Sequence, residues 1–169
     1  MTIETIPIKT LDNKYTPPIY IFDIDGTLSD TTHRLHYIQD YVPRKWDEFY
    51  MAADRDPPRQ HIVDIAKMCL AFGAEVWYWT GRSDVSRDLT IAWLGRHVDP
   101  LIHVDPDRLR MRPSVDHRHD DVLKEHWLLD RTLEDDRKRI QCVFEDRTRV
   151  VNMWRRNGIH CLQVTEGDF

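Results

Sequence analysis

The stretch IYIFDIDGTLSD, from Ile19 to Asp30, carries the strongest signal for the fold of this chain. An apolar run typical of a buried strand ends at two aspartates, Asp23 and Asp25, and Gly26 then allows a sharp turn. Side chains two residues apart on a strand point to the same side, roughly 6–7 Å apart at the backbone. Such like charges repel unless a cation or a shared proton stabilises them. The alternative is a plain turn with two solvated carboxylates.

Apolar runs and helical patterns alternate along the rest of the chain. The predicted strands are Ile19–Asp23, Ala74–Trp79, Leu101–Val104, Ile140–Phe144 and Ile159–Val164. The predicted helices are Pro58–Phe72, Asp84–His97, Asp121–Leu129 and Arg147–Asn157. This alternation predicts an α/β, Rossmann-like fold, with a mainly parallel sheet flanked by helices. Ligands of such sheets bind beyond the carboxyl ends of the strands.

The second predicted helix has an apolar stripe on one face. Its members are Val85, Leu89, Ala92 and Trp93, and Ser83 is the expected N-cap. The preceding helix is expected to end at Gly73, and the last one at Gly158.

Residues 30–57 interrupt the alternation and are rich in aromatic and basic side chains. The segment is long for a loop between a strand and a helix, so it predicts a small helical cap over the site. Several of its side chains are candidates to stack on a nucleobase. They are His33, Arg34, His36, Tyr37, Trp46, Phe49 and Tyr50. Alternatively, Tyr37, Trp46 and Phe49 form the core of the cap itself.

The chain has 169 residues and a net charge of −5, which suits one domain and argues against a broad surface that coats nucleic acid. We expect residues 1–18 to form a surface leader and residues 19–169 the domain. Three cysteines inside apolar runs favour reduced thiols and a cytoplasmic location, or a host cytoplasm for a viral gene. No apolar run approaches the length of about 18 residues that predicts a membrane span.

Three further motifs fall at predicted strand ends. In VWYWTGR, Thr80 and Gly81 suit the binding of a phosphate oxygen, and Arg82 provides a bidentate fork. In DDVLKEH, Lys124 lies near a helix start, where the helix dipole disfavours a cation unless an anion lies opposite. An ordinary turn and a solvated lysine are the alternatives.

The last motif, CVFEDRTRVV, places Glu145 and Asp146 at the end of another apolar strand. Carboxylates from separate strand ends, completed by water and phosphate, are typical ligands of Mg²⁺. A helix N-cap at Asp146 is the alternative. Together the four motifs converge on one pocket and predict a site that handles phosphate.

These motifs resemble those of the haloacid dehalogenase (HAD) superfamily of aspartate-nucleophile phosphohydrolases. FDIDGTL resembles the first motif, WTGR the second, Lys124 the third and Glu145-Asp146 the fourth. HRHDDVLKEH and FEDRTRVVNMWRRNGIHCLQVTEGDF are similar to the third-motif segment and the C-terminal end of the 3′-phosphatase domain of bacteriophage polynucleotide kinase. The chain departs from the phage domain at Glu145, where the latter has an aspartate. It contains no G-x-x-x-x-G-K-[ST] motif, which predicts a phosphatase without the kinase half.

The resemblance implies a role for each motif residue. Asp23 is the implied nucleophile and Asp25 the general acid and base. The implied Mg²⁺ ligands are Asp23, Asp25 through its carbonyl, and Asp146, with Glu145 beside the metal. The implied contacts to phosphate or substrate are Gly26, Thr27, Thr80, Gly81, Arg82, Arg112 and Lys124. Arg110 is a further candidate contact to phosphate or sugar.

The resulting hypothesis is a Mg²⁺-dependent phosphomonoester hydrolase that acts on nucleic-acid 3′ ends or nucleotides. The alternatives are a 5′-nucleotidase, a phosphatase of sugar phosphates or other metabolites, and a non-catalytic subunit for nucleic-acid repair or interaction. No membrane partner is expected, and the sequence does not indicate an oligomeric state.

Overall fold

β1 (Ile19–Phe22) is the central strand of a five-stranded sheet in the computed structural model, which describes residues 16–167. Its neighbours are β2 (Glu75–Ser83) and β4 (Ile140–Arg147), and the edge strands are β3 (Leu109–Arg112) and β5 (Cys161–Gly167). The order is β3-β2-β1-β4-β5 and all pairings are parallel, which confirms the predicted fold class. Residues 1–15 of the predicted leader lie outside the described residues.

The prediction of the third strand was wrong. Residues 101–104 form turns, in which Ile102 N and Val104 N donate to Asp99 O and Leu101 O. Leu101 and Val104 are exposed, so the run does not bury two faces as an inner strand would. The strand is instead Leu109–Arg112, where two buried apolar residues alternate with two half-buried arginines, as on an edge strand with one buried face.

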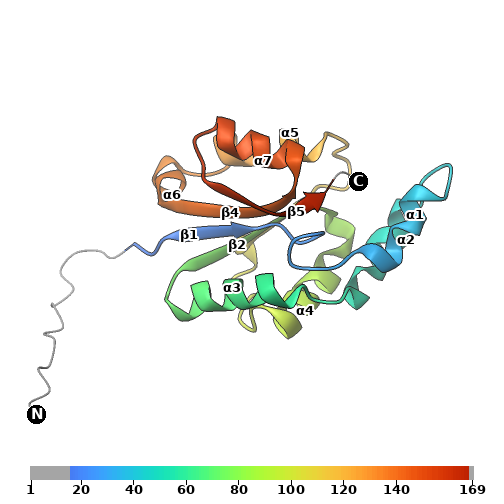
Figure 1. Cartoon of the computed structure of the whole chain (residues 1–169), viewed down its shortest axis with the longest axis horizontal. Coiled ribbons are helices and arrows are strands. Elements are labelled where there is room, and N and C mark those ends of the chain that lie inside the picture. The colour runs from blue at the N-terminus through green and yellow to red at the C-terminus, as the bar shows by residue number, and fades with distance from the viewer. Residues whose placement is uncertain (1–15, 168–169) are drawn as a thin grey trace, which may run out of the picture.

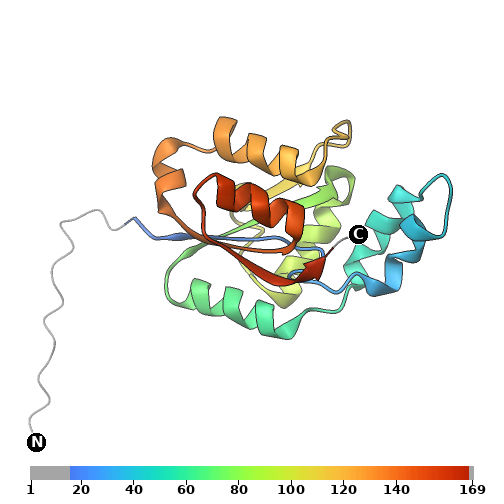
Figure 2. The same ribbon diagram turned by 45° about the horizontal axis from the view of Figure 1, so that its top comes forward.

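Helices cover both faces of the sheet (Figures 1 and 2). α3 (Gln60–Ala71) and α4 (Arg87–His97) pack on one face, and α5 (Asp120–Asp130) and α7 (Thr148–Arg156) on the other. The short α6 (Glu134–Arg139) was not predicted and leads directly into β4. The 3₁₀ turns η3 (Asp84–Ser86) and η4 (Pro106–Arg108) precede α4 and β3. Gly73 and Gly158 adopt positive φ where α3 and α7 end, as expected of C-terminal caps.

The apolar stripe predicted for the second helix was partly wrong. Val85 and Ala92 are exposed, and the buried side chains of α4 are Thr90, Trp93 and Leu94. The reason is a break in the helix, because residues 84–86 form a 3₁₀ turn and the α-helical phase starts again at Arg87. Ser83 makes no side-chain capping bond.

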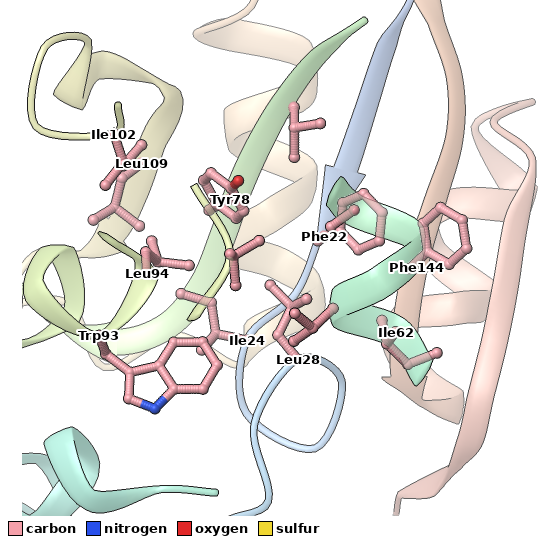
Figure 3. Packing of buried hydrophobic residues seen from close by; sticks show 14 of the residues in the cluster. Phe22, Ile24, Leu28, Ile62, Tyr78, Trp93, Leu94, Ile102, Leu109 and Phe144 are labelled. Atoms are coloured by element: carbon pink, nitrogen blue, oxygen red, sulfur yellow. The ribbon is translucent and has the colours of Figure 1, made fainter. Parts of the chain in front are cut away.

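The core under α3 and α4 is built around aromatic side chains (Figure 3). Phe22 of β1 and Phe144 of β4 stack with ring centroids 4.3 Å apart. Tyr78 and Trp93 fill the space toward α4. A second core lies under α5 and α7 around Trp79, Trp127 and Trp154. These two packed layers fix the positions of the strand ends.

The segment after β1 forms the expected helical cap, which extends beyond the carboxyl ends of the strands (Figure 1, blue to cyan). Its helices are η1 (Thr32–Arg34), α1 (His36–Gln39), α2 (Trp46–Met51) and η2 (Ala52–Arg55). The two ends of the insertion lie side by side, because Asp30 N donates to Pro57 O and Arg59 N to Leu28 O, each at 2.8 Å. The cap is therefore anchored at both ends to the loop that follows β1.

No helix within residues 16–167 is both long enough and apolar enough to cross a bilayer.

Candidate active site

The loop that follows β1 holds the two aspartates of the first motif. Asp23 N donates to Phe144 O at 3.0 Å, which extends the contact between β1 and β4 by one residue. Gly26 has a φ of +82°, and a Cβ at this position would clash with the carboxylate of Asp146. Only glycine fits here, because the left-handed backbone and the close approach of Asp146 both exclude a side chain.

Lys124 of α5 lies between two buried carboxylates. Its Nζ donates to Asp23 Oδ1 and Glu145 Oε2, both at 2.6 Å, and all three side chains are at least 94% buried. Burial alone would lower the pKa of Lys124, but the carboxylates of Asp23 and Glu145 raise it above its usual value. The ammonium is thus held as a fixed positive charge beside Asp23, as the third motif predicted.

Asp23, Glu145 and Asp146 form a buried acidic cluster, with one oxygen of each within 4.8 Å of the others. Burial and the neighbouring carboxylates raise the pKa of Asp23 to about 8, while Lys124 opposes this shift. Burial likewise raises the pKa of Glu145 to about 7 and that of Asp146 to about 6. Both oxygens of Asp146 are buried without a hydrogen-bond partner among the described residues. The cluster has more negative charge than its protein neighbours offset, and it suits a bound cation.

Asp25 has a different environment, because two arginines contact one of its oxygens. Arg34 Nη2 and Arg82 Nε each donate to Asp25 Oδ1 at 2.7 Å. Burial alone would raise the pKa of Asp25, but these two guanidiniums lower it far below its usual value. The two aspartates of one motif therefore have opposite pKa shifts in the protein without a bound cation, raised for Asp23 and lowered for Asp25.

The same two arginines also bind Asp56, a residue that the sequence did not single out. Its carboxylate is fully buried and accepts bonds from Arg34 Nε at 2.7 Å and from Arg82 Nη2 at 2.8 Å. Arg82 was expected to contact phosphate or the leaving group. The structure instead commits Nε and Nη2 to carboxylates, while Nη1 is buried without a partner among the described residues.

The predicted phosphate-binding residues surround this centre. Thr27 and Thr80 are fully buried, and the Thr27 hydroxyl has no partner among residues 16–167. Thr80, Gly81 and Arg82 lie within β2, which is longer than predicted and ends at Ser83. The pairing register of β2 shifts between Thr80 and Ser83. β4 shows a similar shift beside Glu145. Such irregularities re-aim side chains, here at the ends of both strands that flank β1.

Asp120 joins two arginines at the mouth of the site. Its carboxylate pairs with Arg112 Nη2 and Arg147 Nη1, and it lies so close to Gly81 that a Cβ there would clash. Arg112 also donates to Gly81 O at 3.1 Å and to Arg118 O at 2.6 Å, so it holds the loop that precedes α5. The expectation for Arg110 was wrong, because its guanidinium bonds to Trp127 O and Thr132 and lies over the Trp79 ring.

Comparison with known proteins identifies the family. A family model for the phosphatase domain of polynucleotide kinase PNKP matches residues 17–169. The chain belongs to this family of HAD-type phosphatase domains. A chain in a structure of the Pnkp1/Rnl/Hen1 RNA repair complex is 28% identical, with a TM-score of 0.72, and the match covers 99% of this chain and 49% of that one. A second structure of a Pnkp1/Rnl/Hen1 complex gives 28% identity and a TM-score of 0.70 over 98% and 53% of the two chains.

The chain spans about half the length of these Pnkp1/Rnl/Hen1 relatives. The class C acid phosphatase of Bacillus anthracis shares the fold, with 19% identity and a TM-score of 0.58 over 80% of this chain and 54% of that one. The predicted resemblance to HAD phosphatases and to the polynucleotide kinase phosphatase is thus confirmed. The family supports phosphoester hydrolysis as the activity class.

In this HAD-type phosphatase domain, the cap aromatics divide into two groups. Phe49 is 3% exposed, and the Arg34 guanidinium carbon lies 4.0 Å from the centroid of its ring. Phe49 therefore belongs to the core of the cap, which was the alternative to base stacking. Trp46 is 41% exposed and stacks on Tyr50, with ring centroids 5.9 Å apart. Tyr37 is half-buried against His36.

Tyr50 is the cap aromatic that faces the catalytic groups. Burial raises its pKa to about 12; Arg112 and Arg147 oppose the shift, while Asp25 and Asp120 add to it. The charged groups that shift the pKa of Tyr50 therefore belong to the site and not to the cap. Tyr50 and the exposed Trp46 stack on each other, and they are called the cap aromatic pair below.

Proposed function

We propose that this chain is a Mg²⁺-dependent phosphomonoester hydrolase that forms an aspartyl-phosphate on Asp23. The observation that carries the proposal is the buried cluster of Asp23, Glu145 and Asp146, with Lys124 bonded to Asp23 at 2.6 Å. A buried carboxylate beside a fixed ammonium and an unmatched acidic cluster is suited to attack on a dianionic phosphate once a cation is bound. Family membership supports the same reaction class.

Asp23 and Asp146 are the proposed side-chain ligands of the metal, with the Asp25 carbonyl as a further one. Glu145 is less suited, because Oε2 accepts from Lys124 and Oε1 accepts from the backbone amides of Asp146 and Arg147. Both Asp146 oxygens remain without a protein partner among the described residues. Glu145 would thus orient Lys124 and the strand end. Bound Mg²⁺ would neutralise negative charge and polarise the phosphoryl oxygens.

The proposed reaction has two steps. Asp23 attacks phosphorus as the carboxylate, a form that a bound cation would favour, and the bond from phosphorus to the ester oxygen breaks. Asp25 gives a proton to the departing alcohol, so it must first take up that proton when the substrate phosphate binds, because Arg34 and Arg82 keep it ionised in the free protein. In the second step Asp25 takes a proton from water as that water attacks the phosphorus, which releases phosphate and restores the Asp23 carboxylate. Lys124, Thr80 and the hydroxyl of Thr27 would hold the non-bridging oxygens. Arg82 Nη1 would serve the same role, since neither it nor the Thr27 hydroxyl has a partner among the described residues.

The proposed substrate is a nucleic-acid 3′ end or a nucleotide. The cap aromatic pair supports this choice, because an exposed indole stacked on a phenol beside the site offers a platform for bases. Arg44 lies 5.8 Å from the centroid of the Trp46 ring and adds positive charge beside the pair. The net charge of −5 suits contact with a strand terminus more than with a long polymer.

The substrate proposal is tested by phosphate release from four substrates with and without Mg²⁺. They are a 3′-phosphorylated oligonucleotide, a 3′-nucleoside monophosphate, a 5′-nucleoside monophosphate and a sugar phosphate. We expect the highest kcat/KM on a 3′-phosphate, and no release after chelation of the metal. Release from the sugar phosphate alone would overturn the substrate class. Release from none of them in the presence of Mg²⁺ would overturn the reaction.

Removal of the indole in Trp46→Ala should weaken the binding of an oligonucleotide. We expect KM to rise by at least about 5-fold, since stacking of one base on an aromatic ring contributes about 1 kcal/mol or more. KM for p-nitrophenyl phosphate should not change, because this ester does not reach the cap. The control is Phe72→Ala, which removes an aromatic ring that is 85% exposed. Phe72 lies just before β2 begins, at the amino ends of the strands and so opposite the site. Equal effects of both variants on oligonucleotide KM would contradict the role of the pair.

Mg²⁺ should stabilise the protein more at high pH than at low pH. The pKa values of Asp23, Glu145 and Asp146 are raised to about 8, 7 and 6, above reference values of 3.8 for Asp and 4.5 for Glu. The folded state therefore binds more protons than the unfolded chain from about pH 4 to about pH 8, and its free energy of unfolding falls as pH rises through this window. A cation offsets that loss, so the Mg²⁺-induced rise in Tm should be several degrees larger at about pH 8 than at about pH 5.

The control for this measurement is Asp146→Asn. It replaces the proposed metal ligand whose two carboxylate oxygens have no hydrogen-bond partner among the described residues. Its Mg²⁺-induced shift in Tm should be smaller at every pH. A shift of the same size in both proteins would contradict the assignment of the metal to this cluster.

A further inference from the structure

We propose that Asp56 is a positioning residue of this site, one that fixes Arg34 and Arg82 on a single oxygen of Asp25 and leaves the other oxygen for the leaving group. The inference rests on the proposed function, in which Asp25 donates the proton to the departing alcohol. Asp56 itself does not touch the reacting atoms.

Both oxygens of Asp56 are hydrogen-bonded, and the partners other than His33 are buried. Oδ1 accepts from Arg34 Nε at 2.7 Å and lies 2.8 Å from His33 Nε2. Oδ2 accepts from Arg34 Nη2 at 2.6 Å, from Arg82 Nη2 at 2.8 Å and from Ser29 Oγ at 3.1 Å. Its backbone carbonyl accepts from Trp93 Nε1 of α4 at 2.8 Å. The carboxylate is therefore fixed relative to both the cap and the core.

The two arginines each bridge Asp56 and Asp25. Arg34 donates from Nε and Nη2 to Asp56, and its Nη2 also donates to Asp25 Oδ1. Arg82 donates from Nη2 to Asp56 and from Nε to the same oxygen of Asp25. A planar guanidinium held by two carboxylates cannot rotate about either one. Both forks converge on Oδ1 of Asp25, so Oδ2 is the oxygen that serves the ester oxygen of the substrate.

Loss of the Asp56 charge would change this geometry. Arg34 and Arg82 are fully buried, so each would turn its free donors toward the remaining carboxylate, Asp25. Bonds to Oδ2 as well as Oδ1 would then hold Asp25 away from the leaving group. Chain connectivity supports this role, since Arg34 lies where the cap insertion leaves the core and Asp56 where it returns.

A structural ion pair of similar burial provides the matched control. Asp99 is 3% exposed and accepts from Arg108 Nη1 at 2.8 Å and from Tyr78 Oη at 3.4 Å. It follows α4, away from the catalytic residues, so Asp99→Asn removes a buried carboxylate charge without any link to Asp25.

The test compares Asp56→Asn, Asp56→Glu and Asp99→Asn on two phosphate esters. A 3′-phosphorylated oligonucleotide has a basic alkoxide as leaving group, which needs the proton from Asp25, whereas p-nitrophenolate departs without one. For Asp56→Asn we expect kcat on the oligonucleotide to fall on the order of 10²-fold, the lower range of a general-acid contribution, with KM nearly unchanged. The loss on p-nitrophenyl phosphate should be much smaller. Asp56→Glu, which keeps the charge, should lose less on the oligonucleotide.

Asp99→Asn should lower Tm without lowering kcat per folded molecule on either ester. Equal losses of kcat for Asp56→Asn on the two esters, or the same pattern in Asp99→Asn, would overturn the positioning role. If Asp56→Asn does not fold, Asp56→Glu is compared with wild type instead. Its longer side chain displaces the carboxylate, so the ratio of kcat on the oligonucleotide to kcat on p-nitrophenyl phosphate should still fall, and an unchanged ratio would overturn the positioning role. A wild-type protein that hydrolyses neither ester would overturn the proposed function together with this inference.

Discussion

Asp23→Asn should abolish phosphate release while the protein stays folded. The amide keeps the shape of the carboxylate but is not a nucleophile toward phosphorus, so the loss of kcat should be on the order of 10⁴-fold or more, as when other hydrolases lose their nucleophile. The fold should tolerate the change well, because Asp23 is a buried charge that burial and Glu145 destabilise. We expect an unfolding free energy within about 1 kcal/mol of wild type, or higher, without metal.

Steady-state kinetics and thermal denaturation of the same preparation check this result. Asp64→Asn is the matched control, since this exposed aspartate of α3 bonds only to Gln60 in the structure and its loss should leave both kcat and Tm unchanged. An Asp23→Asn variant that keeps wild-type turnover would remove Asp23 from the mechanism.

Lys124→Met should produce the largest loss of stability of any substitution at the site. The change removes the ammonium that bonds to both Asp23 and Glu145 and leaves two buried carboxylates without their cation. Removal of one partner from a buried ion pair costs about 3–5 kcal/mol. The loss should be greater at about pH 8 than at about pH 5, because at low pH the carboxylates take up protons and no longer need a counter-charge. Urea unfolding at the two pH values, without divalent metal, measures it.

The double variant Lys124→Met/Glu145→Gln separates lost charge pairing from lost packing. Removing the second charge should restore part of the stability, with a coupling energy of about 1–3 kcal/mol between the two positions. An equal loss in the single and double variants would contradict the account, in which Lys124 stabilises the fold by pairing with the charge of Glu145.

Three of the four motifs could be located from sequence because their residues lie at strand ends. An apolar run fixes where the strand ends, and all parallel strands end at one edge, so Asp23, Asp25 and Asp146 converge without knowledge of the helices. Lys124 instead lies near the start of α5, where a cation indicates an anion opposite. The predicted positions of the strand ends were less accurate. β2 and β4 continue to Ser83 and Arg147 with irregular pairing, which the hydrophobic pattern alone does not indicate.

Asp56 could not be found in this way, and the role predicted for Arg34 was wrong. Arg34 was a candidate to contact a nucleobase, but it is fully buried and bonds to Asp25 and Asp56. These contacts depend on the path of the cap, which brings residues 9 to 57 positions apart in the chain into one buried cluster. A charged residue within a polar, aromatic segment is indistinguishable from a surface residue until its burial is known. The third strand was misplaced for a related reason, because Leu101–Val104 is more apolar than Leu109–Arg112, whose arginines pack along an edge strand.

The nucleophilic role of Asp23 is tested most directly by trapping the covalent intermediate. A 3′-phosphorylated oligonucleotide with labelled phosphate is mixed with an equal amount of enzyme and Mg²⁺, quenched in acid within one turnover, and digested for mass spectrometry. Asp23 should carry the phosphate in wild type, and no peptide should be labelled in Asp23→Asn. Phosphate on a different residue, or efficient turnover by wild type with no labelled peptide at any quench time, would contradict the mechanism.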